Sequence, residues 1–394
     1  MGQTISLRYC EDYTIKEIDN ALTRCFNDLG GLNNFIKPKT RVMLKCNLST
    51  NSEPNLAKTT HPSIVIALAE KLAKLGASCI IADCPDGTSA NLIDKIYETS
   101  EMLDASNQGN AELNLNHQVF TMEIDGLKAK SLTLMDAIND VDVIINIPKL
   151  IIDKNYGIKG CMDNLFGLIP AEMKEILRTR LILPKNYYNY LLDMYQTFKN
   201  KIVLNVIDAV VISEIDSTPR IMNLILAGSD ALCVDAVAHK ILGRNTEDCS
   251  LFIEADKRNM FDLKEKLHIL GEKAENCVKA DIILPEIDVK GEKCGLSLNQ
   301  REKVYHNYQA RPSVDVSKCK GCKRCFDSCP SKAISEGRDK YNEIYAKLDI
   351  DSCINCFRCV RTCPYQAINV ITPIKYKTLS SKLEKRMVDR KKKD

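Results

Sequence analysis

The sequence lacks the long apolar runs and the phosphate-binding motifs that define several large classes of protein. Its longest apolar stretches, residues 64–75 and 141–152, are interrupted by charge or proline before they reach the roughly 20 residues that cross a bilayer. Residues 1–13 show no secretory signal, and neither G-x-G-x-x-G nor G-x-x-x-x-G-K-S/T occurs. We therefore expect a cytoplasmic protein with no transmembrane segment and no classical dinucleotide or P-loop site.

Histidine is also scarce, with 5 residues, none of which falls in a metal-binding or catalytic-triad motif. His61 stands directly before Pro62 at a predicted helix start, where a capping role is expected. The spacing C-x3-C-x2-C is missing, which disfavours radical S-adenosylmethionine chemistry. Histidine-metal and radical chemistry are thus poor starting hypotheses.

Charge is nearly balanced, with 55 basic and 52 acidic residues and a net charge of +3. The positive excess lies at the end of the chain, because residues 371–394 hold nine Lys and Arg against three acids. We interpret residues 373–394 as a basic tail, most simply a solvated end. We expect no nucleic-acid partner, and the sequence does not predict an oligomeric state.

Residues 1–305 alternate strand-like and helical patterns, which predicts an α/β domain with a mostly parallel sheet. The predicted strands are residues 41–46, 79–83, 141–147, 202–209 and 224–227, with an edge strand at 5–8. The predicted helices are residues 61–75 and 230–242, with a Tyr-rich helical insertion at 171–200 split by Pro184. This large domain precedes a small unit at residues 314–372, for which we expect an α+β ferredoxin-like fold.

The small unit contains a tandem repeat of the spacing C-x2-C-x2-C-x3-C-P. The chain has 18 cysteines, too few for a disulfide scaffold of this size. The repeat contributes eight of them: Cys319, Cys322, Cys325 and Cys329, then Cys353, Cys356, Cys359 and Cys363. A pair of zinc knuckles is the alternative, but three cysteines within seven residues followed by a proline favour iron-sulfur clusters.

The segment closely resembles bacterial two-cluster ferredoxins, in which the fourth cysteine of each motif ligates the other cluster. The resemblance implies two 4Fe-4S clusters and a compartment that is reducing and low in oxygen. The implied ligand sets are Cys319, Cys322, Cys325 and Cys363 for one cluster, and Cys353, Cys356, Cys359 and Cys329 for the other. Lysines and arginines around the motifs favour an acidic redox partner protein, although a solvated basic face explains them equally well.

In the large domain, polar turns follow three predicted strands, at residues 45–47, 83–89 and 156–167. Ligands of open α/β sheets bind beyond the carboxyl ends of the strands, so we expect these turns to line a crevice. Each turn contains a cysteine: Cys46, Cys84 and Cys161. These thiols could ligate a third cluster or metal, or one could be a nucleophile; the alternative is that they are small buried hydrophobic residues.

The order of these motifs resembles the iron-sulfur proteins grouped as domain of unknown function 362, which are often fused to such a ferredoxin unit. The resemblance rests on Lys45 and Asn47, residues 60–62, 148–149 and 164–167, and Glu214. The chain departs from the pattern at residues 151–153 and at Asp163, which removes positive charge from the supposed pocket. As candidate substrate-binding residues we take Asn47, Asp83, Lys149, Asn164 and Glu214, and as candidate catalytic residues Lys45 and Cys161.

Three functions follow from this organisation. The leading hypothesis is an oxidoreductase of unknown substrate, in which the ferredoxin unit passes low-potential electrons to a small molecule in the crevice. The second is an electron carrier or docking adaptor that has no substrate of its own. The third is a protein of cluster or cofactor assembly, or of sensing.

Overall fold

The computed structural model describes most of the chain. The described residues are 4–86, 92–153, 156–181, 184–264, 266–279, 281–285, 311–329, 331–350, 352–353 and 357–371. Within them, no helix is both long and apolar enough to cross a membrane. The predicted basic tail at residues 373–394 and the predicted boundary near residue 305 lie outside this described part.

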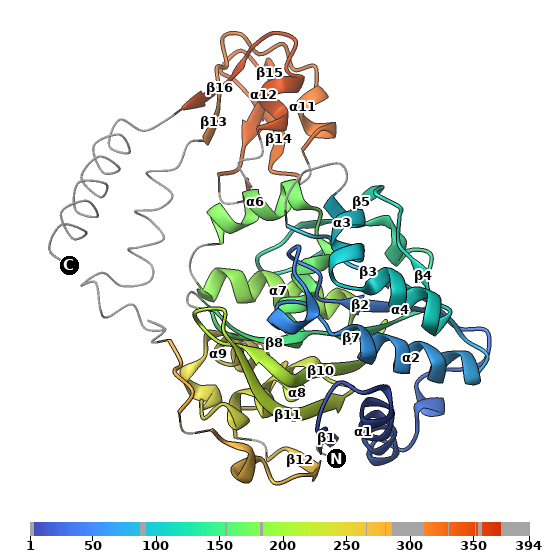
Figure 1. Cartoon of the computed structure of the whole chain (residues 1–394). Coiled ribbons are helices and arrows are strands. Elements are labelled where there is room, and N and C mark those ends of the chain that lie inside the picture. Colours follow the sequence, from blue (N-terminus) through green and yellow to red (C-terminus); the bar gives the residue numbers. More distant parts are fainter. Residues whose placement is uncertain are drawn as a thin grey trace, which may run out of the picture.

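One large, mostly parallel sheet forms the centre of the first domain, as the sequence predicts (Figure 1). Its order is β12, β1, β11, β10, β7, β2, β3, β4; in addition, β8 pairs with β10, and β9 pairs with β8. The bounds are β12 (His268–Gly271), β1 (Thr4–Tyr9), β11 (Pro219–Gly228), β10 (Ile202–Ser213), β7 (Val143–Ile147), β2 (Arg41–Cys46), β3 (Ser78–Ala82), β4 (Glu112–Leu113), β8 (Lys149–Asp153) and β9 (Gly157–Lys159). The predicted edge position of β1 is wrong, because β12 pairs with its outer side.

Helices cover both faces of the sheet and enclose two hydrophobic cores. One core involves α1 (Ile15–Asp28), α2 (Pro62–Lys74), α3 (Leu92–Thr99) and α4 (Met102–Gly109). The other involves α5 (Cys161–Asn164), α6 (Ala171–Arg180), α7 (Pro184–Phe198), α8 (Ala231–Ile241) and α9 (Ser250–Lys257). Strand β2 alternates between them: Val42, Leu44 and Cys46 enter the first core and Met43 the second.

The helix caps follow the sequence closely. Helix α2 begins after His61, whose ring accepts the backbone N–H of Ser63 at 3.3 Å, so the expected capping role is confirmed. The insertion forms α6 and α7, which are separated just before Pro184, as predicted. Asp230 caps α8 by accepting the backbone N–H groups of Leu232 and Cys233.

The ferredoxin-like unit has its own small core. Strand β13 (Arg311–Val314) pairs with β16 (Ile368–Ile371), and β14 (Ile334–Arg338) pairs with β15 (Ile344–Leu348), both antiparallel. Two one-turn helices, α11 (Arg324–Asp327) and α12 (Arg358–Thr362), lie within the cysteine motifs and contain Cys325 and Cys359. The unit lies beside α6 and the hairpin of β5 (Val119–Glu123) and β6 (Ser131–Met135) (Figure 1).

Candidate functional site

A pocket of about 270 Å³ lies beyond the carboxyl ends of β2, β3 and β7. Asn47, Asp83 and Lys149 line it, and each follows the end of one of these strands. The segment from Gly160 to Gly167, helix α6 and the turn between β10 and β11 complete its wall. We call this cavity the α/β pocket; its position is the one expected for a ligand site of an open α/β sheet.

A buried polar network supports the pocket from beneath. The Lys45 ammonium forms an ion pair with Asp83 at 2.9 Å and donates to the Asn164 side chain at 3.3 Å. Asn164 in turn donates to Asn146 at 2.8 Å, which donates to Asn205 at 2.9 Å. These partners fix Asn164, which lines the pocket, in one orientation.

A second buried network holds Lys149. Its ammonium contacts Asp208 at 2.9 Å and the Tyr13 hydroxyl at 2.6 Å, and neither charged side chain is exposed. The Tyr13 ring stacks on His61 at 3.6 Å, and the Tyr13 hydroxyl donates to Asp208 at 2.7 Å. Burial lowers the pKa of Lys149, and Asp208 opposes this shift.

Helix α6 brings two cations to the pocket. Lys174 and Arg178 stand four residues apart and therefore on one helix face. Both contact Asp86, at 3.2 Å and 2.6 Å. Burial acts to raise the pKa of Asp86, but Lys174 and Arg178 outweigh it, so the pKa is lowered. Two positive charges thus share one carboxylate, which leaves this end of the pocket positive.

Another part of the pocket lining is aromatic and carries a carboxyl group with one oxygen that is unsatisfied among the described residues. The rings of Tyr156 and Tyr187 lie 4.3 Å apart, and the Tyr187 hydroxyl donates to Asp163 Oδ1 at 3.1 Å. The second oxygen of Asp163 is buried without a hydrogen-bond partner. Burial raises the pKa of Asp163 to about 7, although Lys159 opposes the shift. Asp163 can therefore hold or release a proton near neutral pH.

The structure brings together four of the five residues predicted to bind a substrate. Asn47, Asp83, Lys149 and Asn164 line the α/β pocket, and Glu214 does not. Its neighbours Ser213 and Ser217 line the pocket instead, because Glu214 closes the turn through backbone hydrogen bonds with Ser217 and Thr218. Sequence reasoning thus placed the correct turn but chose the wrong residue in it.

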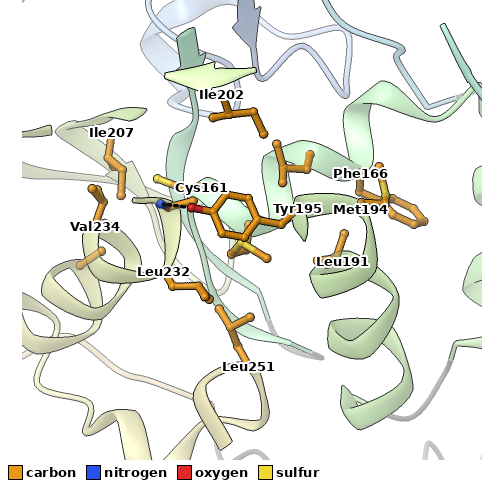
Figure 2. Packing of buried hydrophobic residues seen from close by; sticks show 14 of the residues in the cluster. Cys161, Phe166, Leu191, Met194, Tyr195, Ile202, Ile207, Leu232, Val234 and Leu251 are labelled. Atoms are coloured by element: carbon orange, nitrogen blue, oxygen red, sulfur yellow. Dashed lines mark hydrogen bonds between the residues drawn. The ribbon is translucent and has the colours of Figure 1, made fainter. Parts of the chain in front are cut away.

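Neither predicted catalytic residue reaches the pocket, so we revise their role to a structural one. Lys45 lies beneath the pocket in its ion pair with Asp83, and burial lowers its pKa. Cys161 lies in the hydrophobic core among side chains that include Tyr195 and Leu232 (Figure 2). Burial raises the pKa of the Cys161 thiol well above its usual value, which makes it a poor nucleophile.

The predicted third metal site is also wrong. Cys46 points into the core beside α1 and α2, whereas Cys161 belongs to the core on the other sheet face, with Cys84 packed against it. A strand places adjacent residues on opposite faces, so Cys46 cannot join a site around Lys45. Among the described residues, no three His, Cys, Asp or Glu side chains are grouped to hold a metal ion. The alternative that these thiols are small buried hydrophobic groups fits the structure.

The ferredoxin-like unit, in contrast, gathers its cysteines as the spacing predicts. A small cavity in this unit is lined by four cysteines, which we call the first cysteine set: Cys319, Cys322, Cys325 and Cys363. The sulfurs of Cys319 and Cys363 accept backbone N–H groups from Ala346 and Ala367, at 3.4 and 3.3 Å. Four convergent thiols with N–H donors aimed at the sulfurs suit a 4Fe-4S cluster.

The second cysteine set consists of Cys329, Cys353, Cys356 and Cys359. Cys356 lies outside the described residues; the other three are buried. The Cys329 sulfur accepts the backbone N–H of Ala333 at 3.3 Å, which matches the bonds in the first set. The described members of this set are thus consistent with a second cluster.

Helix α6 lies between this second set and the α/β pocket. One face presents Lys174 and Arg178 to the pocket. The other presents Met173 and Leu177 to a small cavity that Ser331 and Ser352 of the ferredoxin-like unit also line. Ser352 adjoins Cys353, and the Ser331 hydroxyl lies 3.7 Å from the Cys329 sulfur. Helix α6 therefore lines both the α/β pocket and a cavity bordered by the ferredoxin-like unit.

Sequence reasoning missed the pocket residues of the insertion, which are Lys174, Arg178 and Tyr187. The signal for the first two was present, because basic residues four apart mark one face of a helix. Nothing local to the insertion shows which domain surface that face covers. Asp163 was noted only as a departure from a family pattern, and its burial was invisible.

Comparison with known proteins agrees with this organisation. The family model described as a domain of unknown function (DUF362) matches residues 42–240. A second model, described as a 4Fe-4S dicluster domain, matches residues 318–369. The chain is 27% identical over 247 residues to the thylakoid-associated protein sll1697 of Synechocystis, an overlap of 61% of this chain and 75% of that relative.

Among solved structures, the chain is similar to the lactate racemase apoprotein of Thermoanaerobacterium thermosaccharolyticum. The sequence identity is 14% and the TM-score 0.38, over 59% of this chain. The chain spans 56% of the length of that protein.

Proposed function

This chain belongs to the DUF362 family and carries a 4Fe-4S ferredoxin domain, and from this premise we propose that it is an oxidoreductase acting on a small molecule in the α/β pocket. The observation that carries the proposal is the position of helix α6. One of its faces lines the pocket, and the other contacts the unit that holds the second cysteine set. A 4Fe-4S cluster in each set would supply single electrons.

The residues of the pocket favour an anionic substrate. Lys149, Lys159 and Lys45 are each matched by one aspartate, whereas Lys174 and Arg178 share Asp86. Lys58 also lines the pocket, and no ion pair is found for it among the described residues. The pocket is positive at this end, which suits a carboxylate or phosphate group of the substrate.

Asp163 is the residue best placed to exchange a proton with such a substrate. Adding an electron to a bound molecule increases its negative charge, and a proton from Asp163 Oδ2 would compensate that charge. The oxygen has no hydrogen-bond partner among the residues that the structure describes, so a substrate atom can become its partner. Tyr187 holds the other oxygen and orients the group.

The proposal is tested by measuring whether small acids oxidise the reduced protein through this pocket. The full chain, with its clusters loaded and reduced under anaerobic conditions, is mixed with a panel of small carboxylic acids and phosphate esters. Cluster reoxidation is followed by absorbance. For an acceptor that works, Arg178→Glu is expected to slow reoxidation about tenfold or more, because it reverses charge at the anion-binding end.

The matched control is Arg220→Glu, which also breaks an arginine–aspartate pair but lies outside the pocket. It is expected to leave the reoxidation rate within about twofold of the parent, since it leaves the pocket lining intact. Equal rates in the parent and in the Arg178 variant, for every acceptor, would contradict the proposal.

A dedicated electron carrier or docking adaptor is the second candidate. It is favoured by exposed cations of the ferredoxin-like unit that have no ion-pair partner among the described residues, such as Lys320 and Arg324. In this case no small acid reoxidises the clusters, and only an acidic protein does so, at a rate that falls with salt.

A further inference from the structure

The two cysteine sets share one sequence spacing but have different surroundings. In the first set Cys322 is exposed and Cys319 and Cys363 are half-buried. In the second set Cys329, Cys353 and Cys359 are all buried. Cys325 of the first set is also buried, and Cys356 of the second set lies outside the described residues, so among the described cysteines the first set is the more exposed to solvent.

The second set faces the α/β domain. Cys329 borders a cleft whose other wall is formed by Thr121 and Glu123 of β5. Lys332, three residues after Cys329, forms an ion pair with Glu123 at 3.4 Å across this cleft. Ser331 and Ser352 face α6, as described above. Contacts with the large domain thus screen the second set on two sides.

Positive charge surrounds the exposed set. Lys320 and Arg324 flank Cys322, both side chains are exposed, and neither has an ion-pair partner among the described residues. Lys323 between them is neutralised by Glu336 at 2.9 Å. Exposed cations without partners contribute little to folding stability, but they attract opposite charge over about a Debye length, ~8 Å at physiological salt.

We propose that the face formed by Lys320, Cys322 and Arg324, here called the entry face, docks an acidic electron-carrier protein. One electron leaves the carrier, which is oxidised, and reduces the cluster of the first set, with no proton transferred. The second set then lies on the side toward α6 and the α/β pocket. This inference rests on the proposed function only for where the electron goes next; the docking itself does not depend on it.

Arg358 and Arg361 form a competing basic surface, but its shape does not suit a protein. Both line the cleft beside Cys329, a cavity of about 480 Å³ closed on one side by β5. Its wall also contains the acids Glu123 and Asp327. These acids and the nearby strand β5 make the cleft less favourable for an acidic protein partner. Lys320, Cys322 and Arg324 are instead exposed on the described surface of the ferredoxin-like unit.

The test uses the full chain with clusters loaded and an acidic plant-type ferredoxin as the probe. Its dissociation constant is measured by isothermal titration calorimetry at low and at physiological salt. The double variant Lys320→Glu, Arg324→Glu is expected to weaken binding about tenfold or more at low salt. The matched variant Arg358→Glu, Arg361→Glu carries the same change of charge and is expected to stay within about twofold.

Iron content and visible absorbance show whether each variant retains its clusters. Should the glutamate variant lose them, Lys320→Gln with Arg324→Gln replaces it, with a smaller loss of affinity expected. Binding that weakens only in the Arg358 and Arg361 variant would overturn the proposal, as would binding that is absent or independent of salt. The Arg178 variant is expected to bind the probe like the parent, so failure of the proposed pocket chemistry and failure of docking are distinguishable.

Discussion

The α/β pocket and the ferredoxin-like unit use positive charge in opposite ways. In the pocket, Lys149 is buried and paired with Asp208, and Lys174 is buried and paired with Asp86. In the ferredoxin-like unit, Lys320 and Arg324 are exposed without ion-pair partners among the described residues. Buried pairs hold a fixed geometry, whereas free exposed charges act over distance. The first arrangement suits recognition of a small molecule and the second suits steering of a protein.

The cysteines of the two regions also differ, because those of the ferredoxin-like unit are candidate cluster ligands and those of the α/β domain belong to its core. Replacing cysteines by alanine gives the largest expected effect. The double variant Cys319→Ala, Cys325→Ala is expected to remove about half of the iron, which is about four of about eight atoms per chain, because one cubane loses two ligands. Iron and acid-labile sulfide are measured after anaerobic purification.

The control for this experiment is Cys84→Ala with Cys161→Ala, which is expected to keep the full iron content because these thiols belong to the domain core. The structure argues against a third metal site. That hypothesis would be supported again if the parent protein held about twelve irons per chain, or if this control variant lost iron.

The sequence predicted the two regions with unequal success, for a physical reason. Three cysteines of the first set lie within a short segment, so their spacing could be read directly from the sequence, and the resemblance to two-cluster ferredoxins implied Cys363 as the fourth; all four line one cavity. The α/β pocket combines turns after three strands with helix α6, which begins more than eighty residues after the turns that follow β2 and β3, and no local pattern encodes that contact. The strands, helix α2 and the break before Pro184 were predicted from local hydrophobic periodicity and from helix-breaking residues.

One error was avoidable from the sequence. Lys45 and Cys46 are adjacent on one strand and must face opposite sides, so they could never have shared a site. Glu214, in contrast, was an unavoidable error, since the choice among the residues of a turn depends on its backbone hydrogen bonds. The edge position predicted for residues 5–8 failed because β12, which pairs with β1, is more than two hundred residues away.

Removing a buried cation should cost far more stability than removing an exposed one. Lys149→Met is expected to lower the free energy of unfolding by about 3–5 kcal/mol, because Asp208 remains buried without its counter-ion. Chemical denaturation measures the effect. Lys320→Met, in the ferredoxin-like unit, is the matched control and should change stability by less than about 0.5 kcal/mol.

A second variant identifies the cause of this loss. In Lys149→Met with Asp208→Asn the unpaired charge is gone, and part of the lost stability should return. A double variant as unstable as the sum of the single changes would show that packing around Tyr13 and His61, rather than charge, dominates this network.

The last expected effect concerns Asp163 and is seen only as a dependence of stability on pH. Burial raises the pKa of this carboxyl group to about 7 in the folded protein, whereas an aspartate of an unfolded chain titrates near ~3.9. Between these values the folded protein holds a proton that the unfolded chain has lost, so the contribution of Asp163 to stability is present below pH ~4 and is lost as the pH rises toward about 7.

Asp163→Asn removes this titration. Between about pH 4 and 7 the stability of the variant should therefore fall less steeply than that of the parent, and the two slopes should differ by up to ~1.4 kcal/mol per pH unit. Asp235, whose pKa burial raises to about 6, is present in both proteins, so the difference between the two unfolding profiles isolates Asp163. Parallel profiles would mean that Asp163 is charged and solvated at neutral pH. In that case it holds no proton for a substrate, and the contrast between the pocket and the ferredoxin-like unit would rest on the paired lysines alone.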